Sequence, residues 1–271
     1  MTTSNETSTP ATDAVAPAVA RDAGLAGAIA FEWIKLRTVR STWWSLLSGL
    51  AVIAGIGVIL GLSMTASGDN GFDISRPAPH AAMEGILLAQ LPFIAVATLA
   101  VTSEYATRSI TTTLQSVPRR GRMLLAKIAV VTATSFVSGT ALCLLGTAAV
   151  APFAGAYGDF TTRDLVLTSL AAGYFLVAME LLALGLGTLL RSAAGTITAV
   201  TVLLLAVPQL LRVSTVDWLS DASDYLPDAA GNVLFTQSSD PYGVTTAAAV
   251  LLAWASVAIL AGYHRLRSHD A

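Results

Sequence analysis

Charged side chains are scarce in this sequence. They make up 12% of the 271 residues, about half the share usual for a soluble domain, whereas 54% of the residues are apolar. A water-soluble fold could not hide that much apolar surface. The shortage of charge therefore excludes an ordinary soluble protein and predicts a membrane protein, for which we expect no nucleic-acid partner.

Side chains that carry chemistry are also few. Cys143 is the only cysteine, so one chain cannot form a disulfide or a thiolate metal cluster. The three histidines have no metal-ligand spacing with cysteine or carboxylates, and no set of nucleophile, base and acid stands out. The sequence also lacks the G-x-x-x-x-G-K-[ST] phosphate loop. We therefore expect no catalytic residue, no metal site and no cofactor in this chain.

Long apolar runs are what the sequence has in abundance. Each run is close to the ~20 residues that a helix needs to cross ~30 Å of hydrocarbon. The runs lack the alternating polarity of a transmembrane β-barrel. The sequence thus predicts an all-α polytopic integral membrane protein with six transmembrane helices. The predicted spans are residues 43–64, 83–101, 124–150, 165–190, 193–211 and 244–263.

Basic residues lie mostly on one side of these spans. If both termini share a side, that side collects twelve of the 15 basic residues. The other side holds only Arg76, Arg163 and Arg212, together with most of the loop acids. By the positive-inside rule, this asymmetry predicts that both termini are cytoplasmic.

Two segments lie outside the regular pattern. Residues 1–24 are polar and poor in basic residues, which predicts a disordered N-terminal tail before a single transmembrane domain over 25–271. The longest predicted outer segment, 213–243, mixes polar residues with apolar ones such as Trp218 and Phe235. A plain extracellular loop and a segment that dips back toward the membrane both remain open for it.

The stretch between the second and third spans, SEYATRSITTTLQSVPRRGRMLLAK over 103–127, is the most informative. With helical spacing, Ile110, Leu114 and Val117 share one face, and Arg108, Thr112 and Gln115 fall on the opposite one. Pro118 ends this helix. Such an amphipathic helix could lie on anionic lipid headgroups or dock into a groove of a partner protein.

The same stretch resembles a known family. Glu104, a Thr/Ser-rich helix with Leu114, then Val117-Pro118-Arg119, a second basic cluster and Lys127 at the next span are similar to the cytoplasmic loop of ABC type 2 exporter permeases. These are the membrane-spanning subunits of ATP-binding-cassette transporters. FEWIKLRTVRSTWW over 31–44 also resembles the elbow that leads into their first span. Arg108 departs from the pattern, because the family often has glycine there.

The resemblance implies a permease of a bacterial plasma membrane that works as a homodimer or a paired heterodimer. A separate ATP-binding-cassette ATPase subunit would bind ATP and Mg and receive a coupling helix at about residues 104–118. Apolar residues of that helix would pack into the ATPase, and its basic residues would meet an acidic rim or lipid. The implied docking residues are Glu104, Arg108, Ile110, Leu114, Val117, Arg119 and Arg120.

Polar residues inside the spans are candidates for a translocation path. An ionised Glu180 in the fourth span is costly enough to point inward or pair. It is either a substrate, cation or proton contact, or a neutral hydrogen-bonded side chain at a helix interface. Gln90 and Gln209 lie beside prolines in spans two and five, which predicts a kink at each. These two glutamines and Glu180 are the candidate path residues.

Several alternatives remain open at this stage. The chain could instead be an ion-coupled secondary transporter that uses Glu180, or a non-transporting membrane anchor or sensor. Gly57 and Gly61 form a GxxxG pair in the first span, which suits either a dimer seam or packing within one subunit. The charges of the elbow, Glu32 and Lys35 among them, fall around the helix, so it could simply be a basic juxtamembrane anchor.

Overall fold

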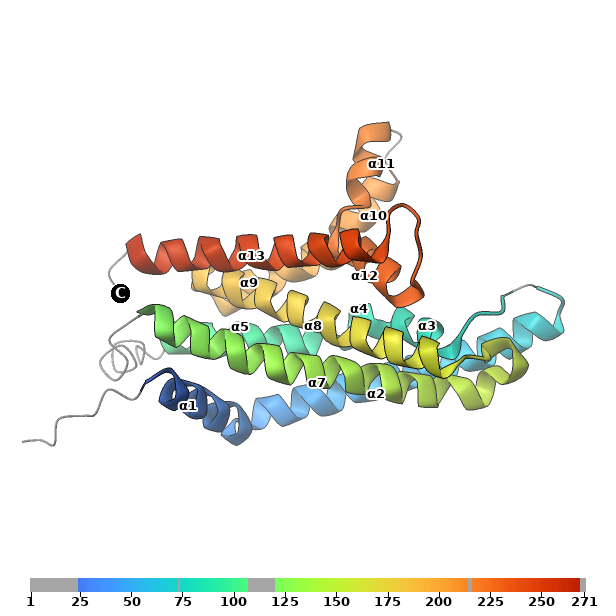
Figure 1. Cartoon of the computed structure of the whole chain (residues 1–271), viewed down its shortest axis with the longest axis horizontal. Coiled ribbons are helices and arrows are strands. Elements are labelled where there is room, and N and C mark those ends of the chain that lie inside the picture. Colours follow the sequence, from blue (N-terminus) through green and yellow to red (C-terminus); the bar gives the residue numbers. More distant parts are fainter. Residues whose placement is uncertain (1–23, 73, 107–119, 214–215, 269–271) are drawn as a thin grey trace, which may run out of the picture.

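The computed structural model describes residues 24–72, 74–106, 120–213 and 216–268, and their regular structure is entirely helical. Five helical runs are long and apolar enough to cross a membrane, and two helices that meet at a 45° bend can form a sixth span. The predicted all-α polytopic membrane fold is therefore confirmed (Figure 1). The five runs are α2 (Arg40–Asp69), α7 (Arg120–Ala154) with η2 (Gly155–Gly158), α8 (Thr162–Leu190), α9 (Ala193–Thr201) with η3 (Val202–Ala206) and α10 (Val207–Arg212), and α13 (Val244–Ser268).

The predicted kink in the second span is present, and the fifth span changes its helix type close to its proline. The second span is broken at Gln90, which separates α4 (Ile86–Ala89) from α5 (Leu91–Ala106) and is followed by Pro92. Short helices α3 (Ala78–Ala82) and η1 (Met83–Gly85) lead into this break. In the fifth span a π-helical turn, η3, ends at Ala206, two residues before Pro208. Proline has no N–H to donate, so the helix widens or bends where it occurs.

The fourth span, α8, is the centre of the bundle and packs against α5, α7 and α13. Glycines let these helices approach closely. A Cβ added at Gly185 would lie 2.4 Å from the carbonyl carbon of Ala258 on α13, and one added at Gly139 on α7 would lie 2.5 Å from the carbonyl oxygen of Ala172. Only the absence of a side chain allows such contacts.

The GxxxG pair of the first span serves packing within the chain. A Cβ at Gly61 would lie 2.6 Å from the Val150 carbonyl oxygen, and one at Gly57 would lie 3.0 Å from the Ala149 Cβ. Both neighbours belong to α7. Of the two interpretations left open by the sequence, the close approach of α2 to α7 is the one that the structure supports.

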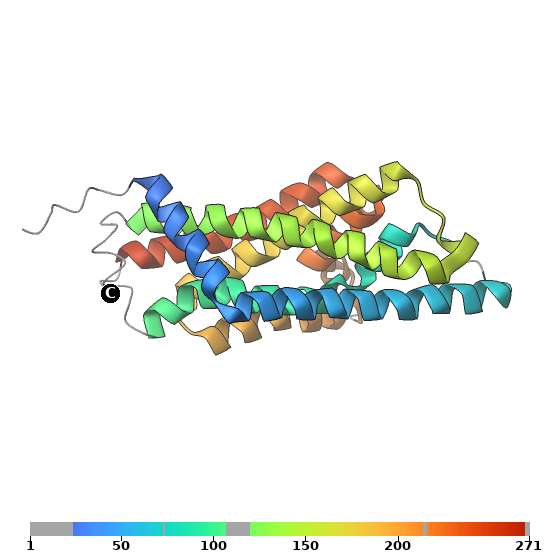
Figure 2. The ribbon, with the colours of Figure 1, turned by 90° about the horizontal axis from the view of Figure 1, so that it is seen from below.

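A separate helix, α1 (Leu25–Thr38), precedes the first span, and the extended residue Val39 divides it from α2. Figure 2 shows α1 running obliquely across the start of α7. The beginning of α1, the end of α5, the start of α7 and the end of α13 all lie at one end of the bundle (Figure 1). We call this the termini end and the opposite one the far end.

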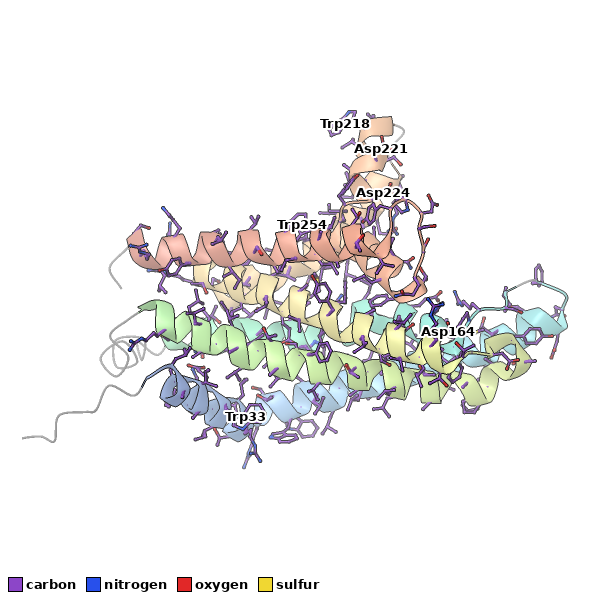
Figure 3. The ribbon with its side chains drawn as sticks, viewed as in Figure 1. Trp33, Asp164, Trp218, Asp221, Asp224 and Trp254 are labelled. Atoms are coloured by element: carbon purple, nitrogen blue, oxygen red, sulfur yellow. The ribbon has the colours of Figure 1, made fainter. Side chains whose placement is uncertain are left out.

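The segment between the last two spans forms two short helices with different surroundings. On α11 (Asp217–Ser223), Trp218 and Asp221 stand away from the bundle (Figure 3). By contrast, α12 (Pro227–Thr236) returns to pack on α8 and α13. The Phe235 ring of α12 meets that of Phe175 edge to face, with centroids 5.2 Å apart. The α12 part of this predicted outer segment thus belongs to the core.

Candidate functional site

Most of the predicted docking helix lies between the described residues 74–106 and 120–213. Glu104 is in the last turn of α5 and Arg120 is the first residue of α7, both at the termini end. Nothing is described of the side chains of these two residues. The remaining docking residues lie outside the described part of the chain, and their role stays a prediction. These are Arg108, Ile110, Leu114, Val117 and Arg119.

A buried ion pair lies beside this segment. The Lys127 Nζ on α7 is 2.8 Å from the Glu32 Oε1 on α1, and the two side chains are only 1% and 6% exposed. Glu32 and Ala28 are the buried residues of α1, so this helix is seated on the bundle by one face. The charges that fall around α1 in the sequence are therefore not equivalent, because Glu32 is directed inward.

Lys127 joins three helices at one point. Besides its contact with Glu32 on α1, its ammonium donates to the Ala100 carbonyl oxygen of α5 at 3.1 Å. Lys127 lies about two turns into α7, the helix that follows the predicted docking segment in the chain. Buried charges cost several kcal/mol each to remove from water, so they persist only when paired. We call Glu32, Lys127 and the Ala100 carbonyl the three-helix junction.

A cavity of about 370 Å³, which we call the lateral cavity, lies between α1, α2, α5, α7 and α8. Its walls are mainly apolar, with Phe93 among them. Its α1 and α2 edge includes Trp33 and Trp43, which are 43% and 53% exposed. Figure 3 places Trp33 at the outside of the bundle near the start of α2. The lateral cavity thus reaches from the bundle surface toward its centre.

The edge of the lateral cavity is held by contacts across the bend between α1 and α2. The Trp43 indole N–H donates to the Arg37 carbonyl oxygen at 3.1 Å. The Arg37 guanidinium lies over the Trp33 ring, 5.9 Å from its centroid. A tryptophan pair beside an exposed arginine is typical of a membrane–water interface, where indole rings and cationic heads meet lipid headgroups.

Glu180 lines the inner wall of the lateral cavity and is 4% exposed. Its carboxyl contacts the Ser135 hydroxyl of α7, and that hydroxyl donates to the Val131 carbonyl oxygen at 2.6 Å. Glu180 therefore lies where α8 meets α7 and also faces a cavity, which is compatible with both interpretations that the sequence leaves open for it.

The other two candidate path residues lie elsewhere. Gln90 is fully buried at the bend of the second span, where its Nε2 is 3.5 Å from the Leu87 carbonyl oxygen. Gln209 is exposed on α10. Neither lines the lateral cavity, so of the three candidates only Glu180 does.

Sequence reasoning missed the partnership of Glu32 with Lys127. By its place in the sequence, Lys127 is one of the basic residues on the side of the termini, and such residues usually remain exposed to solvent. The one available signal was an acid in a basic helix, Glu32 among Lys35, Arg37 and Arg40. Comparison with protein-family models and with curated proteins finds no match for this chain. What the fold defines is a multi-span membrane protein.

Proposed function

We propose that this chain is the membrane permease subunit of an ATP-driven exporter, which forms the translocation path and works with a separate ATPase. The observation that carries the proposal is the three-helix junction. It ties α1 to α5 and α7, the helices that precede and follow the predicted docking segment in the chain. A push on the segment between α5 and α7 would therefore reach α1 and two spans at once.

The mechanism follows from this arrangement. Closure of an ATPase pair on the docking helix displaces the start of α7 and the end of α5. Because Lys127 holds Glu32, α1 moves with them instead of sliding over α7. The lateral cavity lies between these same elements, so its shape changes with each displacement. Its apolar walls and single buried carboxyl suit an apolar or amphiphilic compound that enters from the lipid.

The partners follow from the same proposal. The ATPase binds ATP and Mg, and a second permease copy completes the path. The charge asymmetry supports placing the termini end, with the docking helix, in the cytoplasm of a bacterial cell. Lipid headgroups meet the exposed Trp33, Arg37 and Trp43 near that face.

The docking helix can be tested by a matched pair of variants. Leu114→Asp places a charge on the apolar face that is predicted to enter the ATPase, and Gln115→Asp places the same charge on the opposite face. We expect Leu114→Asp to abolish copurification of the ATPase and Gln115→Asp to retain it. Protection of the buried Cys143 thiol from maleimide reports that both variants are folded. If folded Leu114→Asp still binds the ATPase, the docking role is wrong.

An ion-coupled transporter is the second candidate, because the Glu180 carboxyl lines a cavity. Glu180→Gln removes the ionisable group and keeps the size of the side chain. Transport that is unchanged at every pH would remove Glu180 from the mechanism. If wild-type transport needs no ATP and Glu180→Gln abolishes it, the ion-coupled transporter is favoured over the ATP-driven exporter.

A further inference from the structure

A second cavity, of about 300 Å³, lies at the far end of the bundle, and we call it the far-end cavity. It is bounded by the entry to the second span, the end of α10, and helices α8 and α12. Two of the three basic residues on the predicted outer side, Arg76 and Arg212, line it together. Its polar residues are Arg76, His80, Glu84, Arg212, Asp228, Asn232 and Thr236.

The charges of the far-end cavity are paired and balanced. Arg76 forms an ion pair with Glu84, and Arg212 Nη2 lies 2.8 Å from the Asp228 Oδ2. Each arginine has its own carboxylate. An anion alone, or a cation alone, would therefore meet one pair of groups that attracts it and one pair that repels it. Neither sign alone is favoured.

Three polar atoms of this cavity are buried without a hydrogen-bond partner in the described structure: Asp228 Oδ1, Arg76 Nε and His80 Nε2. The Asp228 side chain is only 8% exposed. An ionised carboxylate oxygen can only accept, an arginine Nε–H can only donate, and a histidine nitrogen can do either. A buried polar atom without a partner costs about 1–3 kcal/mol, which a suitable ligand would recover.

From these features we infer that the far-end cavity binds a zwitterion that carries an ammonium N–H donor and an anionic phosphate or carboxylate oxygen. The ammonium faces Asp228, and the anionic oxygen faces Arg76 and His80. The side chains of Arg76 and Arg212 are 40% and 49% exposed, so they can turn toward a ligand without disturbing the core. The rings of Phe175 and Phe235 supply an apolar wall beside this polar set.

Phosphoethanolamine has this chemistry, either as the headgroup of phosphatidylethanolamine or as a free compound. The site does not depend on the proposed exporter function, because its residues lie at the far end of the bundle and not at the termini end. Binding can therefore be measured on the full chain alone, without ATPase or nucleotide. Native mass spectrometry of the detergent-purified protein reports bound lipid or free phosphoethanolamine directly.

Binding of three lipids tests which chemical features of the ligand the cavity recognises. Phosphatidylethanolamine has both charges and N–H donors, phosphatidylcholine has both charges without N–H donors, and phosphatidylglycerol has no cation. We expect phosphatidylethanolamine to bind at least about tenfold more tightly than the other two, because one charge-assisted hydrogen bond is worth that factor. Displacement of the lipid by free phosphoethanolamine would assign the site to the free compound as well. Failure of that displacement would assign it to the lipid headgroup.

Matched variants assign the binding to the cavity. Asp228→Asn should reduce binding of phosphatidylethanolamine to the level of phosphatidylcholine, whereas Asp221→Asn on the outlying α11 should leave it unchanged. If Asp228→Asn fails to fold, Asn232→Trp at an exposed position of α12 fills the cavity instead and should also remove the preference. Equal binding of the three lipids, or an unchanged preference in a folded cavity variant, overturns the inference.

Discussion

Removing one member of the buried ion pair should destabilise the bundle far more than removing both. Lys127→Met keeps the length of the side chain and leaves the Glu32 carboxylate buried without its partner. Glu32→Gln removes the carboxylate that lies 2.8 Å from the Lys127 ammonium, whose side chain is 1% exposed. The double variant removes both charges together. The three proteins and the wild type form a double-mutant cycle for a contact between residues 95 positions apart.

The magnitude follows from burial. Breaking a buried pair by removing one partner costs about 3–5 kcal/mol, because the remaining charge stays desolvated. Lys127→Met should fall at the lower end of this range, since the Lys35 Nζ is 3.9 Å from the Glu32 Oε2 and can move closer. Glu32→Gln should also fall within this range. The double variant should be more stable than either single variant, because hydrophobic or neutral replacement of both charges is often tolerated.

The chain contains its own reporter for this cycle. Cys143 is the single cysteine and is fully buried on α7, so a fluorogenic maleimide reacts with it only when the bundle opens. The temperature or denaturant midpoint of this reaction in detergent ranks the four proteins. A cost below about 1 kcal/mol for both single variants would refute the reasoning. So would a double variant whose cost equals the sum of the two single costs, because coupled residues do not add.

Two further predictions test packing and the far-end cavity. Gly61→Ala should cost about 1–3 kcal/mol of stability in the Cys143 assay, because its Cβ would lie 2.6 Å from the Val150 carbonyl oxygen. Gly55→Ala on the same helix faces open space and should be neutral or slightly stabilising. Equal effects of the two variants would contradict the assignment of this face of α2 to the contact with α7. Burial raises the pKa of Asp228, although the Arg212 charge opposes this shift. As the pH falls, Asp228 should therefore become protonated while the pH is still above the ordinary aspartate pKa of about 3.9. Binding of phosphatidylethanolamine should weaken over the same pH range. Because His80, Arg76 and Glu84 face the same cavity, the titration is repeated in Asp228→Asn, where weakening at the same pH would assign it to another group.

The spans were predictable because they depend on local composition. An apolar run of membrane length has few other stable outcomes, so hydropathy alone located the five long spans and the bent pair that can form a sixth. The proline next to Gln90 indicated the bend within that pair. The return of α12 into the core was only one of two open interpretations. Its burial depends on the Phe235 contact with Phe175, a residue of a different span.

The polar contacts were not predictable, because each joins elements whose relative placement the sequence does not encode locally. Glu32 meets Lys127 only because α1 crosses α7 at that point (Figure 2). Arg76 and Arg212 were recognised as rare basic residues of their side, but not as neighbours in one cavity. The burial of Glu180 was expected from its cost in a membrane, whereas its contact with Ser135 required the packing of α7 on α8.

Purification of the native chain from its own membrane in mild detergent tests the central claim most directly. The exporter proposal predicts that an ATP-binding-cassette ATPase copurifies in equal amount and that the complex hydrolyses ATP. Protection of Cys143 from maleimide shows in the same sample that the permease is folded. A folded chain that purifies without any ATPase would contradict the proposal.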